Sequence, residues 1–254
     1  MTEPVIQLER VGKRYGATAA LEDVSLAIGP GEFVALVGGS GSGKTTLLKT
    51  INRLIVPDGG RVRVEGQEVA AAEPHALRRR IGYVFQEVGL FPHLSVGENI
   101  AITPKLLGWE RPRIAARIEA LLDLVALPRE VASRPPAALS GGQRQRVGVA
   151  RALAAEPRLM LMDEPFGALD PLTRDALGAE YRALHERLSL TTVTVTHDMA
   201  EAVLLADRIV VLQGGRVLAD GPPAALLASA DPDVRQLLEA PKRQAERLKA
   251  RLGA

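Results

Sequence analysis

The stretch Gly38-Gly39-Ser40-Gly41-Ser42-Gly43-Lys44-Thr45 fits the pattern G-x-x-x-x-G-K-[ST], and this stretch decides the fold. It follows the short apolar run 33–37, which is typical of a buried strand, and it precedes the helix-like segment 45–51. Glycines let consecutive backbone N–H groups turn inward around a phosphate chain, and a helix N-terminus adds unsatisfied donors. The sequence therefore predicts a phosphate-binding loop between a strand and a helix.

Two side chains of this loop have the chemistry that a polyphosphate and its metal ion need. Lys44 is expected to reach the β- and γ-phosphates and to assist catalysis, and the Thr45 hydroxyl is expected to bind Mg²⁺. A glycine-rich turn without a ligand is the alternative, and the flanking strand and helix argue against it. The loop alone does not choose among kinases, GTPases and ATPases. The predicted nucleotide-binding residues here are Gly38, Gly39, Ser40, Gly41, Ser42, Gly43, Lys44, Thr45 and Thr46.

Composition excludes several classes of protein. The 254 residues are enough for one large α/β domain or for a core with an inserted subdomain. The formal net charge is only +2, from 32 basic and 30 acidic side chains, so nothing favours nucleic acid as a partner. The absence of cysteine excludes disulfides and thiolate metal sites. We see no secretory signal and no apolar stretch near the ~18–20 residues that span a bilayer.

Strand and helix patterns alternate along the chain. Such alternation predicts an α/β fold with a mostly parallel sheet that is covered by helices on both faces. Residues 87–157 are expected to form an inserted helical subdomain, and the basic, amphipathic residues 242–252 a solvated final helix. The predicted strands are 5–9, 23–28, 33–37, 81–85, 159–162 and 192–196, and the predicted helical stretches are 95–127, 142–155 and 172–188.

Two adjacent carboxylates, Asp163 and Glu164, end the apolar strand 159–162. The carboxyl ends of parallel strands face the ligand crevice of such a sheet. Asp163 is expected to orient Mg²⁺, directly or through water, and Glu164 to polarise the attacking water as general base. An acidic pair is often only a solvated turn, but after a buried strand in a protein with a phosphate loop the catalytic interpretation is favoured.

A second glycine-rich stretch, Leu139-Ser140-Gly141-Gly142-Gln143, begins another predicted helix. Ser140 is a good N-cap, and the two glycines leave the first N–H groups of the helix accessible. One interpretation is a plain helix cap. The other is a second anion site, which binds the γ-phosphate of a different nucleotide.

With these motifs the chain resembles the ATP-binding subunits of ABC (ATP-binding cassette) transporters over nearly its whole length, with residues 139–143 as the signature sequence. Other motifs of the family follow in order. Tyr15 matches the aromatic residue that stacks on adenine, and Gln86 matches the glutamine that bridges Mg²⁺ or water and the helical subdomain. Ala168-Leu169-Asp170 matches the D-loop, and His197 the switch histidine.

The resemblance implies a RecA-like P-loop NTPase core with an N-terminal antiparallel β subdomain. It implies a domain over 1–240, with the core at about 1–86 and 158–240 and the helical subdomain at about 87–157, and a basic C-terminal helix at 241–254 without CBS domains. It also implies ATP and Mg²⁺ as cofactors. The implied catalytic residues are Glu164, His197, Gln86 and Lys44, and the implied metal ligands are Thr45, Gln86 and Asp163.

The implied assembly is a head-to-tail homodimer in which each chain covers the nucleotide of the other. The residues that do so are Leu139, Ser140, Gly141, Gly142, Gln143 and Asp170. Permease subunits and, through the complex, a solute-binding protein would be partners at the cytoplasmic face of the inner membrane. The exposed-looking apolar turn 87–96, with Leu90 and Phe91, would receive a short helix of the permease; packing of this turn on the core is the alternative.

Three stretches are similar in particular to the ATPases of osmoprotectant importers, which take up glycine betaine, carnitine or choline. They are 49–55, 89–93 and 162–174. Gly39 stands where proline is usual in the phosphate loop, which is expected to loosen that turn slightly. Import of polar amino acids, export, a soluble ABC ATPase and a P-loop kinase are the alternatives. A kinase explains neither residues 140–142 nor His197.

Overall fold

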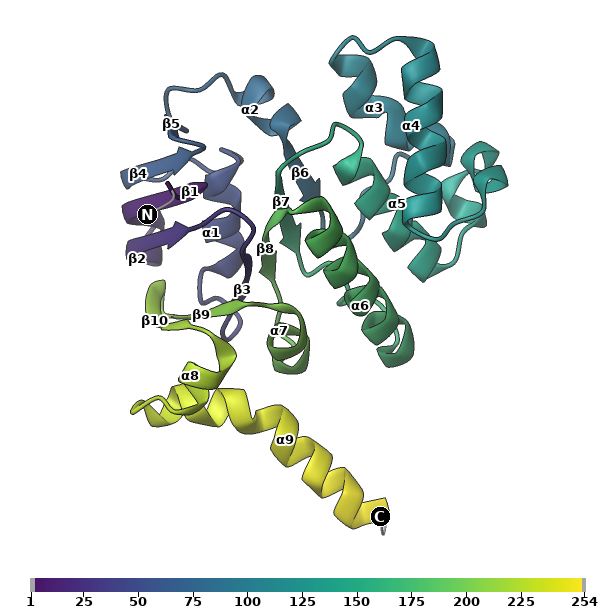
Figure 1. Ribbon diagram of the computed structural model, residues 1–254. Helices are drawn as coiled ribbons and strands as arrows, with labels where there is room; N and C mark the ends of the chain where they lie inside the picture. Colours follow the sequence, from purple (N-terminus) through teal and green to yellow (C-terminus); the bar gives the residue numbers. More distant parts are fainter. Residues whose placement is uncertain (1–2, 253–254) are drawn as a thin grey trace.

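A parallel sheet forms the centre of the molecule, which a computed structural model describes for residues 3–252 (Figure 1). The predicted ranges 1–240 and 241–254 therefore extend beyond the described residues at their outer ends. The strand order in this sheet is β10-β9-β3-β8-β7-β6, and every neighbouring pair is parallel except β9 with β10. The strands are β3 (Phe33–Val37), β6 (Ile81–Val84), β7 (Leu159–Asp163), β8 (Thr191–Val195), β9 (Arg208–Gln213) and β10 (Arg216–Gly221).

Both faces of the central sheet are buried, as a continuous apolar strand predicts. Alternate side chains of β3 enter two different apolar clusters, because successive side chains of a strand point to opposite faces. Phe33, Ala35 and Val37 belong to one cluster, and Val34 and Leu36 belong to the other. The first cluster includes residues of the helical segment between β6 and β7, so it packs that segment on the sheet.

A second sheet is antiparallel and has the order β2-β1-β4-β5. It shares the second apolar cluster with the central sheet and with α1, the helix that follows the glycine-rich loop. Its strands are β1 (Ile6–Tyr15), β2 (Thr18–Ile28), β4 (Gly59–Val64) and β5 (Gln67–Glu68), so β1 and β2 are longer than predicted and β4 and β5 were not predicted.

Helices lie on both sides of the central sheet (Figure 1). A group of helices between β6 and β7 stands apart from the rest, drawn in teal, and follows the predicted insertion at 87–157, whose boundaries stay predictions. This group is α3 (Val96–Leu106), α4 (Arg111–Leu124), two short 3-10 segments at Arg129–Ser133 and Pro136–Ala138, and α5 (Gly141–Leu153); the others are α1 (Lys44–Ile51), α2 (Pro74–Arg80), α6 (Pro171–Leu188), α7 (Met199–Leu205), α8 (Pro223–Leu227) and α9 (Pro232–Leu252).

The predicted helical stretch 95–127 contains two helices, α3 and α4. Gly108, with a φ of +73°, lies between them, and Pro112 lies in the first turn of α4. The predicted final helix needs correction at its start. The last helix begins ten residues before 242, and its first turns are buried through Val234 and Leu238. In the described part of the chain, no helix combines the length and the apolar character that crossing a bilayer requires.

Candidate nucleotide-binding site

The loop between β3 and α1 takes a shape that only glycine allows at two positions. Gly38 has a φ of +144°, and a Cβ atom there would lie 2.1 Å from the carbonyl oxygen of Leu212 in β9. Gly43 has a φ of +102°, and its Cβ atom would lie 2.3 Å from the carbonyl oxygen of Ala20. One strand of each sheet therefore lies directly against the loop, and a side chain larger than that of glycine would clash with it at both positions.

Lys44 begins α1 and folds back over this loop. Its Nζ atom donates hydrogen bonds to the carbonyl oxygens of Gly38, at 2.9 Å, and Gly39, at 2.8 Å. Burial lowers the pKa of Lys44, while the charges of Glu164 and Asp163 oppose that shift. The first turn of α1 has no acidic residue, and no side chain caps it, so its N–H donors and its Lys44 ammonium present positive charge on one side of the loop.

A hydroxyl and a carboxylate meet beside the loop. Thr45 Oγ1 donates to Asp163 Oδ1 at 2.9 Å, and Lys49 Nζ lies 3.6 Å from Asp163 Oδ2. These hard oxygen atoms are of the kind that Mg²⁺ prefers. Nowhere in residues 3–252 do three or more His, Asp or Glu side chains form a metal cluster. A magnesium ion held by Thr45 and Asp163 would therefore need further oxygen ligands of other kinds, such as phosphate, water or a side-chain amide.

Glu164 sits at the end of β7 with a strained backbone. Its φ is +46°, a left-handed value that costs a non-glycine residue free energy, and its N–H donates to the Val195 carbonyl oxygen at 2.9 Å. Its Oε2 atom accepts a hydrogen bond from Gln86 Nε2 at 3.3 Å and lies 3.1 Å from His197 Nδ1. Three residues that are far apart in the sequence thus meet at one carboxylate.

The pocket beside this carboxylate has a volume of about 500 Å³, which is within the usual range for small-molecule sites. Tyr15 lies at its edge with 52% of its surface exposed, available to stack on a flat ligand. Ala20 lines the pocket and was not predicted, because nothing in its sequence context distinguishes it from any strand alanine. The other lining residues are Ser40, Gly41, Ser42, Gly43, Lys44, Thr45, Thr46, Glu164 and His197.

Residues 139–143 start a helix as predicted, with a complete capping box. Gln143 N donates to Ser140 Oγ at 3.2 Å, and Ser140 N donates to Gln143 Oε1 at 3.0 Å. None of the pocket-lining residues of the described chain comes from 139–143, and Asp170 is not among them either. Asp170 caps α6 through Thr173 N. These residues therefore do not contact the pocket of their own chain, and their role toward a second nucleotide stays a prediction.

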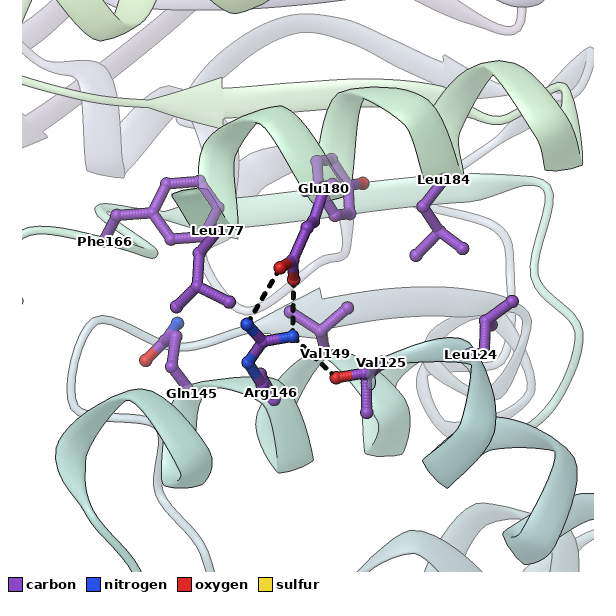
Figure 2. Close-up of a pocket in the computed structure, with 10 residues that line it drawn as sticks. Leu124, Val125, Gln145, Arg146, Val149, Phe166, Leu177, Glu180 and Leu184 are labelled. Atoms are coloured by element: carbon purple, nitrogen blue, oxygen red, sulfur yellow. Dashed lines mark hydrogen bonds and ion pairs between the residues drawn. The ribbon is translucent and has the colours of Figure 1, made fainter. Parts of the chain in front are cut away.

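The two capped helix starts lie side by side. A Cβ atom on Gly142 would be 3.0 Å from Thr173 Cγ2. Further along, the guanidinium of Arg146 on α5 donates to both carboxylate oxygens of Glu180 on α6, at 2.5 and 2.9 Å, and to the Val125 carbonyl oxygen at 2.8 Å (Figure 2). This side chain thus connects α5, which begins at the signature sequence, to α6, which follows the D-loop.

This combination of a glycine-rich loop, a hydrogen-bonded Thr–Asp pair and a glutamate at the end of β7 defines a P-loop nucleotide-binding cassette. The chain belongs to the ABC transporter family: the model of that family matches residues 21–167. The resemblance expected from the motifs is thereby confirmed.

Curated relatives include the "Glycine betaine/carnitine/choline transport ATP-binding protein OpuCA" of Bacillus subtilis, which is 50% identical over 88% of this chain. The chain spans 59% of that relative's length. The "Glycine betaine uptake system ATP-binding protein YehX" of Escherichia coli is 49% identical, again over 88% of this chain and over 72% of the relative.

Among solved structures, the dimeric bacterial ABC transporter cassette MJ0796 has a TM-score of 0.78 and 35% identity, covering 85% of this chain and 98% of that one. The same cassette in a post-hydrolysis state bound to ADP and Pi has a TM-score of 0.76 and 34% identity, and it also covers 85% of this chain and 98% of that one. These likenesses confirm the predicted P-loop NTPase fold.

Proposed function

We propose that this chain binds and hydrolyses ATP as the motor subunit of an ABC importer for a small solute, a quaternary-amine osmoprotectant. One observation carries the hydrolytic part: Glu164 is held by Gln86 and His197 at the mouth of the phosphate loop. The printed names of relatives at 49–50% identity support the solute class.

In the proposed reaction, the loop and Lys44 hold the β- and γ-phosphates, and Tyr15 stacks on the base. A magnesium ion held by Thr45 and Asp163, with Gln86 as a further ligand, would neutralise charge on the phosphates. Both contacts of Glu164 fall on Oε2, which leaves Oε1 to accept a proton from the attacking water. His197 keeps that carboxylate in line and contacts the γ-phosphate.

The proposed active unit is a homodimer. The capped start of α5, with Ser140, Gly141 and Gly142, would bind the γ-phosphate in the pocket of the partner chain, with Asp170 beside it. The absence of these residues from the lining of their own chain's pocket, within the described residues, supports this arrangement. Binding of ATP would then close the dimer, and hydrolysis would release it.

A groove on the helical side fits the proposed contact with a permease. It has a volume of about 400 Å³, and its lining includes Phe85 and Phe91, which are 45% and 46% exposed. Leu90 is partly buried against the core, so the expected exposure holds for Phe91 but not for Leu90. We place the chain at the cytoplasmic face of the inner membrane, where the permease also connects it to a solute-binding protein and no nucleic acid takes part.

The test is reconstitution with a candidate permease and its binding protein in lipid vesicles. We expect co-purification, and ATP hydrolysis that rises when glycine betaine or choline is supplied on the binding-protein side. Stimulation by a polar amino acid instead would move the assignment to the nearest competing importer class. Full hydrolysis with no affinity for any permease would favour a soluble ABC ATPase.

A further inference from the structure

One arginine connects two loops of the proposed catalytic machinery. Arg174 lies in the first turns of α6, and its side chain is 22% exposed. Its Nη2 atom donates to the carbonyl oxygen of Leu169 in the D-loop at 3.1 Å, and its Nη1 atom donates to Asp198 Oδ2 at 2.8 Å. Asp198 is the residue directly after the switch histidine, so a single guanidinium spans from the D-loop to the switch loop.

Asp198 is itself held in place on all sides. Its Oδ1 atom accepts from the N–H groups of Ala200, at 2.9 Å, and Glu201, at 3.2 Å, so it caps α7. Its own N–H donates to Thr196 Oγ1 at 3.0 Å. These hydrogen bonds fix the carboxylate of Asp198 and the backbone on both sides of His197, its neighbour in the chain.

On the other side, the D-loop touches the signature helix. A Cβ atom on Gly141 would lie 3.8 Å from Leu169 Cδ2, and Gly142 approaches Thr173, the residue before Arg174. A continuous series of contacts therefore runs from the signature and D-loop, through Arg174 and Asp198, to His197 and the carboxylate of Glu164.

We propose that Arg174 and Asp198 are positioning residues that couple the two nucleotide sites of the dimer. The inference rests on the proposed function, in which the signature and D-loop face the partner's nucleotide while Glu164 serves the chain's own. Engagement of the partner's nucleotide shifts the D-loop, and the ion pair transmits that shift to the switch loop. The pair thereby makes hydrolysis at one site depend on occupancy of the other.

The test replaces each partner with an uncharged polar residue. Asp198→Asn keeps a good N-cap for α7 but loses the charge, and Arg174→Gln removes the guanidinium. We expect ATP affinity within about twofold of the wild type, while kcat falls roughly tenfold. We also expect the Hill coefficient for ATP to fall toward one, which a loss of stability alone does not produce. Arg174→Lys, which can pair with Asp198, is expected to recover part of the loss.

Arg182→Gln is the matched control. Arg182 also lies on α6, is 26% exposed, and pairs with Asp207 at 2.8 Å beyond the end of α7, away from the D-loop. Its variant is expected to lose thermal stability like Arg174→Gln while keeping the wild-type kcat and Hill coefficient. The double variant Arg174→Gln/Asp198→Asn is expected to be no slower than the worse single one, because both remove the same link.

Several outcomes overturn the coupling. They are wild-type cooperativity in both single variants, multiplied losses in the double variant, or an equal kcat loss in Arg182→Gln. In each of these cases the wild-type protein still hydrolyses ATP, and the proposed function stands. A wild-type protein that does not hydrolyse ATP, alone or with its permease, removes the proposed function and this inference together.

Discussion

At the scale of single residues, Glu164 combines a left-handed backbone with two side-chain partners on one oxygen. Strain of this kind persists only where the surroundings impose it, and here both the β7–β8 hydrogen bond and the loop at 164–167 do so. The result is a carboxylate held in a single orientation, which is what a general base requires before its substrate arrives.

Replacement of this carboxylate by an amide separates binding from turnover. Glu164→Gln is expected to keep ATP affinity and to lower kcat by at least about 100-fold, because the amide cannot accept the proton. Calorimetry with ATP measures the affinity, and a phosphate-release assay measures kcat. We also expect an ATP-dependent dimer of this variant to accumulate. Normal steady-state hydrolysis would show that another group acts as base.

Glu201, under the switch loop, is a second unusual carboxyl group. Burial raises its pKa to about 7, with the nearby charges of Asp198 and Glu164 adding to the shift and Thr196 and Arg174 opposing it. Between the usual pKa of 4.5 and this raised value, the folded state keeps a proton that the unfolded state has released. The contribution of Glu201 to stability is therefore fully present below pH 4.5 and is lost as the pH rises through about 7.

The pH effect gives a direct test. The stability lost over this range is at most about 3 kcal/mol for a shift of this size. Glu201→Gln is expected to remove that slope and to be more stable than the wild type at pH 8, as measured by denaturant unfolding at several pH values. Equal slopes in both proteins would mean that Glu201 ionises in the folded chain as easily as in water.

At the scale of elements, the pair Arg146–Glu180 sets how α5 lies on α6 (Figure 2). Arg146→Glu or Glu180→Arg is expected to cost about 1–2 kcal/mol, because each places like charges together in a partly buried site. The double swap is expected to restore only part of this loss, since a glutamate at 146 cannot donate to the Val125 carbonyl oxygen. Denaturant unfolding of the four proteins measures the coupling, and purely additive losses would contradict it.

Elements with a strong local signal could be predicted from the sequence. The run 33–37 and the serine-capped helix after 140 were both expected where they occur, because an apolar run and a cap act within a few residues. Strands β4 and β9 were missed. The first is rich in glycine and arginine and is held by pairing with β1, and the second follows a helix whose apolar run it continues. β4 pairs with β1, and β9 pairs with β3; these two partners are far away in the sequence, so local patterns do not reveal the pairings.

The same distinction applies to the site. The residues of the phosphate loop were predictable because they are consecutive in the sequence. The hydrogen bond between Thr45 and Asp163 follows from the order of the parallel strands. The link from Arg174 to Asp198 was not predictable, because an arginine in a helix is ordinarily a solvated charge, and only the fold brings the two loops within its reach.

At the scale of the whole molecule, the groove around Phe91 is the proposed contact with the permease. Asn99, which is fully buried, hydrogen-bonds to both the N–H and the carbonyl oxygen of Phe91. We therefore expect the backbone of residue 91 to keep its position when the side chain is truncated to alanine. Phe91→Ala is expected to keep basal ATP hydrolysis and to lose most solute uptake in vesicles. Leu106→Ala, at an exposed position on the end of α3, is the control, and full uptake by the Phe91 variant would remove the proposal.

Because Ser140 lies away from the pocket that holds Glu164, damage to these two residues is expected to fall on different sites of the dimer. Chains carrying only Ser140→Arg and chains carrying only Glu164→Gln would each be inactive alone. In a mixed pair, one site carries both lesions and the other carries none. An equal mixture is then expected to recover about a quarter of the wild-type hydrolysis, provided that one intact site can turn over alone. Two inactive variants would then complement each other, as happens in enzymes whose active sites are shared between subunits.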